Sequence, residues 1–191
     1  MKKVFLIICC IASLISYSQK RTTQFSIAAE SAVMATSQAY KAYNLGFGGS
    51  SKVLFPTGKK NYFTGTVGVL AFSGRADDAS KVFGSSVPSG LANIAVPGLT
   101  IIPVKVGYKY FHNKWFNTEA EAGYTFASVL KVQNDYPGSV GGYDFSLGFG
   151  FLVAKKLDIG LRYELFQSTA SETNYTSFIG LRTLLMVDFS K

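Results

Sequence analysis

The amino-acid sequence predicts an all-β fold, namely an eight-stranded antiparallel up-and-down transmembrane β-barrel, with ten strands as the alternative. The clearest observation is the stretch from Ser177 to Phe189, where apolar residues alternate with small or polar ones, as in Ile179-Gly180-Leu181-Arg182. Such alternation places the apolar side chains on one face of a strand. The same pattern recurs about eight times along the chain, behind a segment typical of an export signal. Together these observations are typical of bacterial outer-membrane β-barrels.

The first 18 residues are predicted to be a signal peptide, which leaves residues 19–191 as a single barrel domain. Lys2 and Lys3 provide the positive start, and residues 4–15 form an apolar core. Ser16-Tyr17-Ser18 then places small residues at the positions that a signal peptidase recognises. The apolar core is too short to cross a bilayer as a helix.

The two cysteines, Cys9 and Cys10, lie inside this predicted signal peptide. A lipoprotein signal would need a small residue before the cysteine, and here that residue is Ile8 or the other cysteine. We therefore interpret both cysteines as apolar residues of the signal. Cleavage after Ser18 would leave a mature chain without cysteine, which excludes disulfides, cysteine metal ligands and cysteine nucleophiles.

The composition of the 191-residue chain favours a barrel wall over a bundle of membrane helices. Hydrophobic residues make up 48% of the chain, but no run approaches the roughly twenty apolar residues that a membrane helix needs. The formal net charge is +8, and much of the surplus lies in short connections, at Lys59-Lys60, Lys114 and Lys155-Lys156. No segment interleaves basic and aromatic residues on one exposed face, so we expect no nucleic-acid partner.

Eight segments carry the strand pattern, and each is near or above the roughly nine to eleven residues that a tilted membrane strand needs. They are Phe25 to Met34, Tyr43 to Phe55, Tyr62 to Ser73, Leu99 to Phe111, Phe116 to Leu130, Tyr143 to Val153, Leu157 to Gln167 and Ser177 to Phe189. Short connections, at 56–61, 112–115 and 154–156, alternate with longer polar ones. Short turns of such barrels lie on the periplasmic side, so both termini are predicted to be periplasmic. A hairpin hidden in the long segment 74–98 would give ten strands.

The chemistry of the two strand faces decides whether the apolar side chains face lipid or an internal core. In residues 99–111, Ile102, Val104 and Val106 lie opposite Lys105 and Lys109. A soluble lipocalin-like barrel would carry many long hydrophilic side chains outside, whereas here the second face is small and sparsely charged, as a narrow lumen requires. Aromatic residues near the strand ends predict two interfacial girdles, one with Phe55, Phe63, Tyr110, Phe116 and Phe189 and one with Tyr43, Phe126 and Tyr143.

The predicted lumen receives the charged residues of the strands. The candidate ion network consists of Glu30, Lys105, Lys109, Glu119, Glu121, Arg162, Glu164 and Arg182, with Lys52, Asp144, Asp158 and Asp188 also facing inward. Pairing across the turn at 112–115 places Lys109 opposite Glu119, and Glu164 and Glu30 are the expected partners of the two arginines. Eight strands leave an interior just wide enough for its own side chains, so the network is predicted to plug the barrel. A charged path for small solutes is the alternative.

The sequence predicts no enzyme, no cofactor and no metal site. The one histidine, His112, falls in a predicted periplasmic turn, so a Ser-His pair at the outer rim cannot form. Asp77-Asp78 and Glu172 are too few and too far apart for a metal site, and we interpret them as solvated loop charges. The glycines around Phe47 and Phe149 lie inside predicted strands, without the following helix that supplies an anion site.

Several of these segments resemble those of a known family. The chain resembles small outer-membrane β-barrel proteins of Bacteroidetes-type bacteria in three features. These are the signal ending Ser16-Tyr17-Ser18-Gln19, the closing strand Ile179-Gly180-Leu181-Arg182, and two strands rich in glycine and aromatic residues, Tyr43-Asn44-Leu45-Gly46-Phe47-Gly48 and Tyr143-Asp144-Phe145-Ser146-Leu147-Gly148-Phe149-Gly150. The architecture of these proteins is OmpX-like and OmpA-like. The resemblance implies a location in the outer membrane of a Gram-negative bacterium. No peptidoglycan-binding domain follows Phe189, so the cell-wall anchoring role of full-length OmpA-like proteins is not expected.

From these features we expect a structural or surface-interaction barrel that displays its outer loops, above all the segment 74–98. The expected partners are outer-membrane lipid and the barrel insertion machinery, and the sequence names no extracellular ligand. A monomer is expected because a closed barrel has no unpaired edges. The alternatives are a narrow porin or transporter for small solutes, and a soluble periplasmic lipocalin-like binding barrel.

Overall fold

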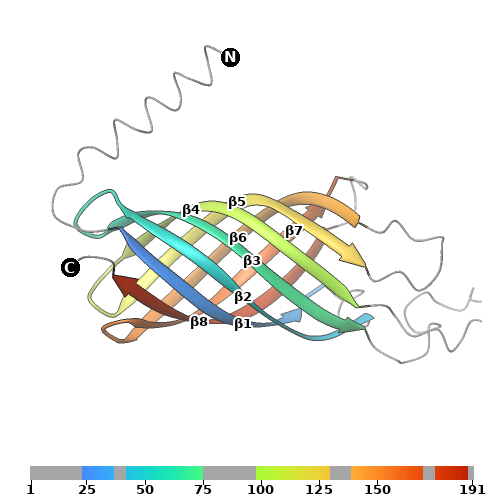
Figure 1. The fold of residues 1–191 in the computed structure, drawn as a ribbon, viewed down its shortest axis with the longest axis horizontal. Coiled ribbons are helices and arrows are strands. Elements are labelled where there is room, and N and C mark those ends of the chain that lie inside the picture. Colours follow the sequence, from blue (N-terminus) through green and yellow to red (C-terminus); the bar gives the residue numbers. More distant parts are fainter. Residues whose placement is uncertain (1–22, 37–41, 75–97, 130–138, 170–174, 189–191) are drawn as a thin grey trace, which may run out of the picture.

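The chain folds into a closed barrel in which each strand pairs antiparallel with its neighbours in chain order and the last strand closes on the first (Figure 1). The computed structural model describes residues 23–36, 42–74, 98–129, 139–169 and 175–188. Its strands are β1 (Gln24–Met34), β2 (Tyr43–Pro56), β3 (Asn61–Gly74), β4 (Leu99–Phe111), β5 (Phe116–Val129), β6 (Ser139–Ala154), β7 (Leu157–Ser168) and β8 (Tyr175–Asp188). The predicted fold class of an eight-stranded up-and-down barrel is confirmed.

The strand boundaries agree closely with the alternation in the sequence. The largest difference is at β6, which begins at Ser139 rather than at Tyr143. β3 pairs directly with β4, from Asn61↔Tyr110 to Phe72↔Leu99, so the alternative of ten strands is not needed to close the wall there. The predicted signal peptide and most of the segment 74–98 lie outside the described residues. Within the described residues, no helix has the length and apolar character needed to cross a membrane.

The strand register fixes the shape of the barrel. Following paired residues once around the wall leads from Gln24 back to β1 at Met34, through Leu54, Thr64, Gly107, Glu121, Ser146, Glu164 and Phe178. The circuit therefore ends ten residues further along β1 than it began. With a rise of about 3.3 Å per residue and a strand spacing of about 4.8 Å, this stagger corresponds to a strand tilt of about 40°.

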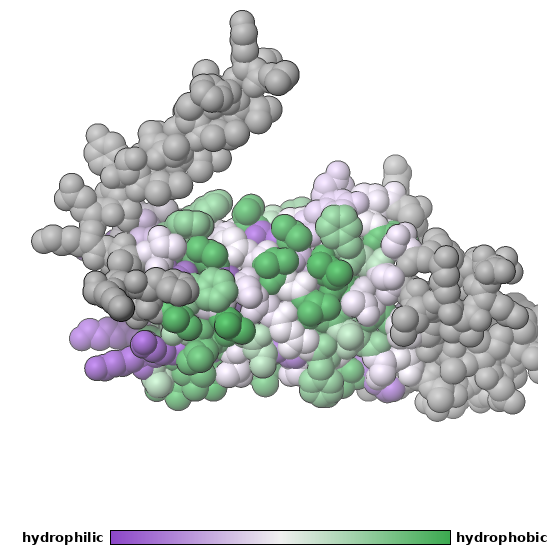
Figure 2. Space-filling model, viewed as in Figure 1, coloured by the Kyte–Doolittle hydropathy of each residue, from purple (hydrophilic) through white to green (hydrophobic). Residues whose placement is uncertain are grey.

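The outer surface of the barrel wall is apolar. The exposed side chains of its strands include Val67, Ile102, Val104, Val106, Phe145, Leu147, Leu161, Ile179, Leu181 and Leu185, and the charged side chains of the same strands point inward. Figure 2 shows hydrophobic side chains over the middle of the wall and hydrophilic side chains projecting at one end. The predicted assignment of the two faces is thus confirmed.

Two ends of the barrel are distinguished by their connections. The turn end carries the connections 57–60, 112–115 and 155–156, together with the start of β1 and the end of β8 (Figure 1). The loop end carries the longer connections. Trp115 at the turn end stacks on Phe151, with ring centroids 5.7 Å apart and an interplanar angle of 12°. Phe126 and Tyr143 lie exposed toward the loop end, in the position that the predicted aromatic girdle requires.

The interior is more apolar at its ends than the sequence pattern predicts. At the loop end, a buried cluster fills the barrel with Ala32, Met34, Leu70, Phe72, Ile101, Ala127 and Phe178. Tyr43, predicted to belong to the outer girdle, packs against this cluster instead. Toward the turn end, a smaller cluster contains Ala28, Leu184 and Met186. The expectation that the inner face is small is therefore wrong at the two ends of the barrel, because large apolar side chains occupy the interior on both sides of the charged layer.

Candidate functional site

The charged side chains of the strands meet in the middle of the barrel. All eight residues of the predicted network lie buried in the interior, as do Lys52, Asp144 and Asp158. The side chain of Asp188 lies outside the described residues. Because neighbouring inward positions on a strand are two residues apart, Glu119 and Glu121 of β5 point into the lumen together. Lys105 and Lys109 do the same on β4.

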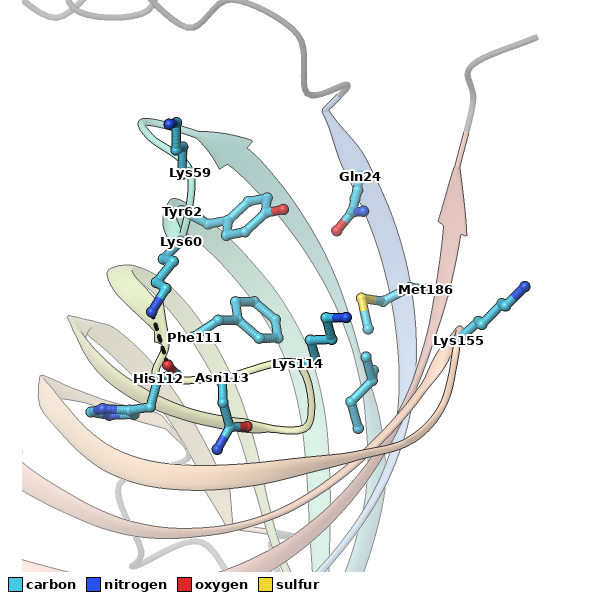
Figure 3. Close-up of a pocket in the computed structure, with 11 residues that line it drawn as sticks. Gln24, Lys59, Lys60, Tyr62, Phe111, His112, Asn113, Lys114, Lys155 and Met186 are labelled. Carbon is cyan, nitrogen blue, oxygen red and sulfur yellow. Dashed lines mark hydrogen bonds between the residues drawn. The ribbon is translucent and has the colours of Figure 1, made fainter.

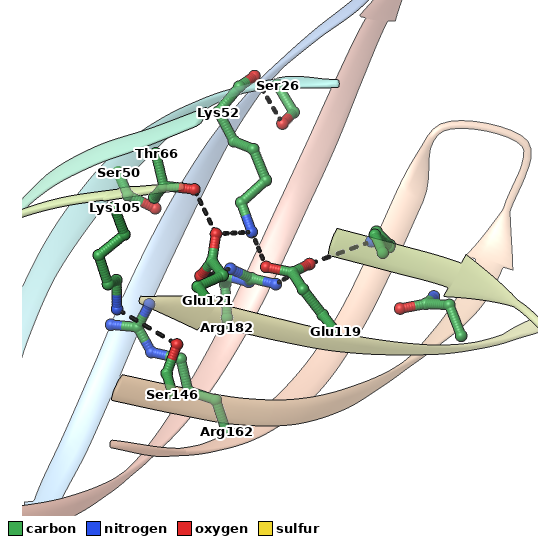
Figure 4. Close-up of polar contacts among 12 residues, drawn as sticks. Ser26, Ser50, Lys52, Thr66, Lys105, Glu119, Glu121, Ser146, Arg162 and Arg182 are labelled. Carbon is green, nitrogen blue, oxygen red and sulfur yellow. Dashed lines mark hydrogen bonds and ion pairs between the residues drawn. The ribbon is translucent and has the colours of Figure 1, made fainter. Parts of the chain in front are cut away.

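Glu119 and Glu121 form the centre of the first group of ion pairs. Lys52 on β2 ion-pairs with Glu119, and its Nζ lies 2.9 Å from Glu121 Oε1. From β8, Arg182 Nη2 lies 3.0 Å from Glu119 Oε2, and Nη1 lies 3.9 Å from Glu121 Oε2. Thr66 Oγ1 completes the group by donating a hydrogen bond to Glu121 Oε1 over 2.5 Å. Figure 4 shows both cations directed at these two carboxylates.

A second group lies closer to the turn end, around Asp158 on β7. Lys109 Nζ lies 2.5 Å from Asp158 Oδ2 and 3.8 Å from Glu119 Oε2, so this lysine links the two groups. Asn117 Nδ2 donates to the same Asp158 oxygen over 3.1 Å.

The third group surrounds Glu164 on β7. Lys105 Nζ lies 2.9 Å from Glu164 Oε1, and Arg162 Nε lies 2.9 Å from Glu164 Oε2. Arg162 also reaches β1, where its Nη2 lies 2.6 Å from Glu30 Oε2. Ser50 Oγ donates to the other oxygen of Glu30 over 2.5 Å. The group thus joins strands from both sides of the seam between β8 and β1.

Glycines on the inner face make room for the long cationic side chains. A Cβ built on Gly123 would lie 2.9 Å from Cγ of Lys105 and 2.1 Å from the Val104 carbonyl oxygen. At Gly180, the same atom would lie 3.4 Å from Nε of Arg162. Gly123 therefore serves packing, since a larger residue would clash with the Val104 carbonyl and with the Lys105 stem, whereas the contact at Gly180 is an ordinary one.

The structure assigns some partners differently from the sequence pattern. Lys109 lies opposite Glu119 in the register, as predicted, but its nearer partner is Asp158. Arg162 contacts both expected carboxylates, Glu30 and Glu164, whereas Arg182 contacts Glu119 and Glu121 instead. Arg182 lies directly opposite Glu30 in the strand register, but within the described residues it forms no ion pair with Glu30 or Glu164. An arginine can span a narrow lumen, so its partner need not lie on an adjacent strand.

Little open space remains in this layer. The described interior holds five basic residues against six acidic ones, namely Lys52, Lys105, Lys109, Arg162 and Arg182 against Glu30, Glu119, Glu121, Asp144, Asp158 and Glu164. Asp144 accepts a hydrogen bond from Thr125 Oγ1 over 2.5 Å. A cavity of about 10 Å³ lies between Glu119, Glu121, Arg162 and Arg182, which is about the space that one water molecule needs.

Sequence reasoning missed the buried cluster at the loop end. Its signal is present in the segment Val69-Leu70-Ala71-Phe72, where apolar residues follow one another without alternation. A continuous apolar run indicates a strand that is apolar on both faces. In the barrel, Val69 faces outward while Leu70 and Phe72 face the interior. The ring of Phe72 meets that of Phe178 edge to face, with centroids 5.7 Å apart.

The described residues offer no cluster suited to a metal ion. No group of three or more His, Cys, Asp or Glu side chains among them could hold a metal ion. His112 lies in the turn between β4 and β5, where its Nε2 is 2.9 Å from Thr118 Oγ1 and its ring stacks on Phe116. Asp77, Asp78 and Glu172 lie outside the described residues.

Comparison with solved structures identifies the same fold in three bacterial proteins. Ail, the attachment invasion locus protein of Yersinia pestis, is 11% identical with a TM-score of 0.56, covering 88% of this chain and 100% of that one. The N-terminal β-barrel domain of Pseudomonas aeruginosa OprF is 9% identical with a TM-score of 0.55, covering 86% and 97%. Neisserial surface protein A is 15% identical with a TM-score of 0.55, covering 87% and 97%.

No protein-family model and no curated protein matches this sequence. At identities of 9 to 15% the structural likeness establishes the fold alone. The predicted origin in a Bacteroidetes-type bacterium stays a prediction. The chain thus has the small closed-barrel fold of Ail, the OprF barrel domain and neisserial surface protein A.

Proposed function

We propose that this chain is an integral outer-membrane β-barrel with a closed interior, and that its rigid wall presents the long loops at the cell surface. The observation that carries the proposal is the inverted distribution of side chains. Charged residues are paired inside the barrel, and apolar residues cover its outside. A protein in water buries its apolar side chains, whereas a barrel in lipid exposes them.

The exterior supports a lipid environment in two ways. Leu147 is 67% exposed and Val106 is 56% exposed, both on the middle of the wall. Among the strand residues whose side chains the structure describes, no charged residue shares that surface, which is what a hydrocarbon layer requires. Trp115 and Phe151 stack near the turn end, at the level where aromatic side chains are enriched at membrane interfaces.

Two successive layers of side chains, the ion pairs and the apolar cluster at the loop end, support a closed interior. A hydrated ion crossing the barrel would have to separate the buried ion pairs around Glu119 and Glu164, and breaking such pairs is strongly unfavourable. It would then meet the apolar cluster around Phe72 and Phe178 at the loop end, which opposes water entry as hydrophobic constrictions do. The same filled interior argues against a lipocalin-like barrel, because no apolar ligand fits within the charged layer.

Closure predicts the absence of conductance. Purified protein reconstituted in planar lipid bilayers is expected to give no stable, reproducible channels, because paired side chains fill the lumen. The same preparation should migrate as a compact band in mild SDS and shift on boiling, which demonstrates that the barrel is folded. Reproducible unitary channels from that folded band would contradict the closed interior and favour a narrow porin.

The loops are the proposed site of interaction, since recognition commonly resides on exposed loops that a rigid scaffold positions. Replacing residues 76–96 with a short Gly-Ser linker is expected to leave insertion and the boiling-dependent mobility shift unchanged, because β3 and β4 pair directly as far as Phe72 and Leu99. Adhesion of cells that carry the trimmed protein should change. A control variant with a linker of the same composition and the original length separates loop sequence from loop length. Loss of insertion on trimming would count against a scaffold role.

A further inference from the structure

The turn end of the barrel opens into a cavity of about 740 Å³ that the lumen network does not involve. Four lysines line it, and we call it the lysine vestibule: Lys59, Lys60, Lys114 and Lys155. They come from all three short turns, which the closed barrel gathers around one mouth. Figure 3 shows these lysines and the apolar floor of the vestibule around this mouth.

The positive charge of the vestibule is not neutralised within the described residues. No acidic side chain is among the residues that line it. The ion pairs of the described barrel involve only the interior cations, and none includes a vestibule lysine. Lys60 Nζ donates to the backbone oxygen of His112 over 3.0 Å, which leaves its charge unpaired. A concave site lined by one sign of charge raises the local concentration of the opposite ion.

The floor of the vestibule is apolar. It is formed by Tyr62, Phe111, Leu152 and Met186. Tyr62 and Phe111 meet edge to face with centroids 5.6 Å apart, and both Tyr62 and Met186 are buried. Beneath this floor, Lys109 Nζ lies 5.3 Å from the centroid of the Phe111 ring, but its charge is already paired with Asp158 and Glu119, so the positive charge of the vestibule comes from its own four lysines.

We propose that the lysine vestibule binds an organic phosphate, with its anionic group among the lysines and its apolar part on the floor. Lysine ammonium groups bind phosphate as compact point charges. The volume of 740 Å³ lies within the range of about 300 to 1,000 Å³ that is usual for small-molecule sites. The site is separate from the surface loops and from the closed interior, so it adds a ligand-binding role at the opposite end of the barrel.

Two methionines of the barrel provide matched reporters for this proposal. Met186 lies in the vestibule floor, and Met34 lies in the buried cluster at the loop end. With methyl-¹³C methionine in the protein and phosphatidylcholine nanodiscs as the host, titration with phenyl phosphate is expected to shift the Met186 methyl signal saturably and to leave Met34 unchanged. Inorganic phosphate should bind more weakly, because it does not contact the floor. An unmoved Met186 signal, or equal shifts of both methyls, would overturn the proposal.

Charge variants test the lysines themselves. The quadruple variant Lys59→Gln/Lys60→Gln/Lys114→Gln/Lys155→Gln is expected to weaken binding of phenyl phosphate by at least about tenfold, even if each exposed contact contributes modestly. Lys155→Gln, which should also weaken binding, and Lys156→Gln form the matched pair, since each removes one charge from the same turn and only Lys155 lines the vestibule. Equal weakening by both variants would show a diffuse charge effect and overturn the site.

A final comparison identifies the source of the phosphate. In nanodiscs that contain phosphatidylglycerol, a lipid headgroup in the vestibule would shift the Met186 signal before titration and suppress the response to phenyl phosphate. An unchanged titration would instead indicate a soluble ligand. Both results support the site and assign its source, and neither depends on the role proposed for the loops.

Discussion

Replacing Glu119 with glutamine is expected to lower the free energy of unfolding by about 3 kcal/mol, since removal of one partner from a buried ion pair leaves an uncompensated charge. Glu119 contacts three cations, namely Lys52, Lys109 and Arg182. Urea unfolding in lipid vesicles, followed by the fluorescence of the single tryptophan, measures the change. Because Trp115 lies at the turn end, it reports on the barrel wall rather than on the loops.

Two further variants make the Glu119 experiment specific. Glu172→Gln removes a carboxylate from the chain between β7 and β8, and little change is expected because the sequence predicts a solvated loop charge at this position. The double variant Glu119→Gln/Arg182→Gln should be more stable than the sum of the two single changes predicts, since it removes a cation together with its partner. Additive effects, or a change of less than about 0.5 kcal/mol for Glu119→Gln, would show that the ion pairs contribute little to stability.

Replacing Leu147 with arginine is expected to destabilise the barrel in lipid by about 2 to 4 kcal/mol, the effect of a charge on the lipid face at the bilayer midplane. Leu147 is 67% exposed near the middle of β6. Val153, at the turn end of the same strand, is 64% exposed, and Val153→Arg should cost only about 0 to 1 kcal/mol because it lies near the interface. Unfolding in phosphatidylcholine vesicles measures both changes.

The pair of arginine variants tests the proposed membrane location directly. The two positions have similar exposure on the same strand, so in water an arginine at either one would be equally well solvated. A difference that depends on depth therefore requires a lipid layer around the wall. The outer-membrane proposal would be contradicted if the protein stayed folded without lipid or detergent and the arginine variants at Leu147 and Val153 both changed the free energy of unfolding by nearly zero. That result would favour the soluble alternative.

The two layers that close the interior differ in how they depend on the sequence around them. The ion pairs around Glu119 require particular partners on β2, β4 and β8. The cluster around Phe72 and Phe178 requires only apolar volume at the loop end, and such packing tolerates exchange of one apolar residue for another of similar size. The two layers share no side chain, although both are built on the same strands.

The strands and their faces were predictable because the information that specifies them is local. In β4, Ile102, Val104 and Val106 face outward while Lys105 and Lys109 face inward, as the alternation alone requires. Successive side chains of a strand point to opposite faces, so a strand with lipid on one face and the lumen on the other alternates apolar and polar residues. The short turns mark where the chain reverses. The apolar cluster at the loop end was harder to predict. Phe72 faces inward but is itself apolar, so it extends an apolar run and hides the two-residue alternation of the strand.

By itself, the sequence determined that the chain forms an eight-stranded barrel with apolar residues outside and charged residues inside. Tertiary structure alone decided which charges meet, as when Arg182 reaches Glu119 and Glu121 rather than Glu30. The sequence placed three lysine-bearing turns on one side, and the closed barrel arranges them around a single mouth. The meeting of charges was not predictable because it depends on the ten-residue stagger accumulated over all eight strand pairings, and no local pattern along the chain encodes that sum.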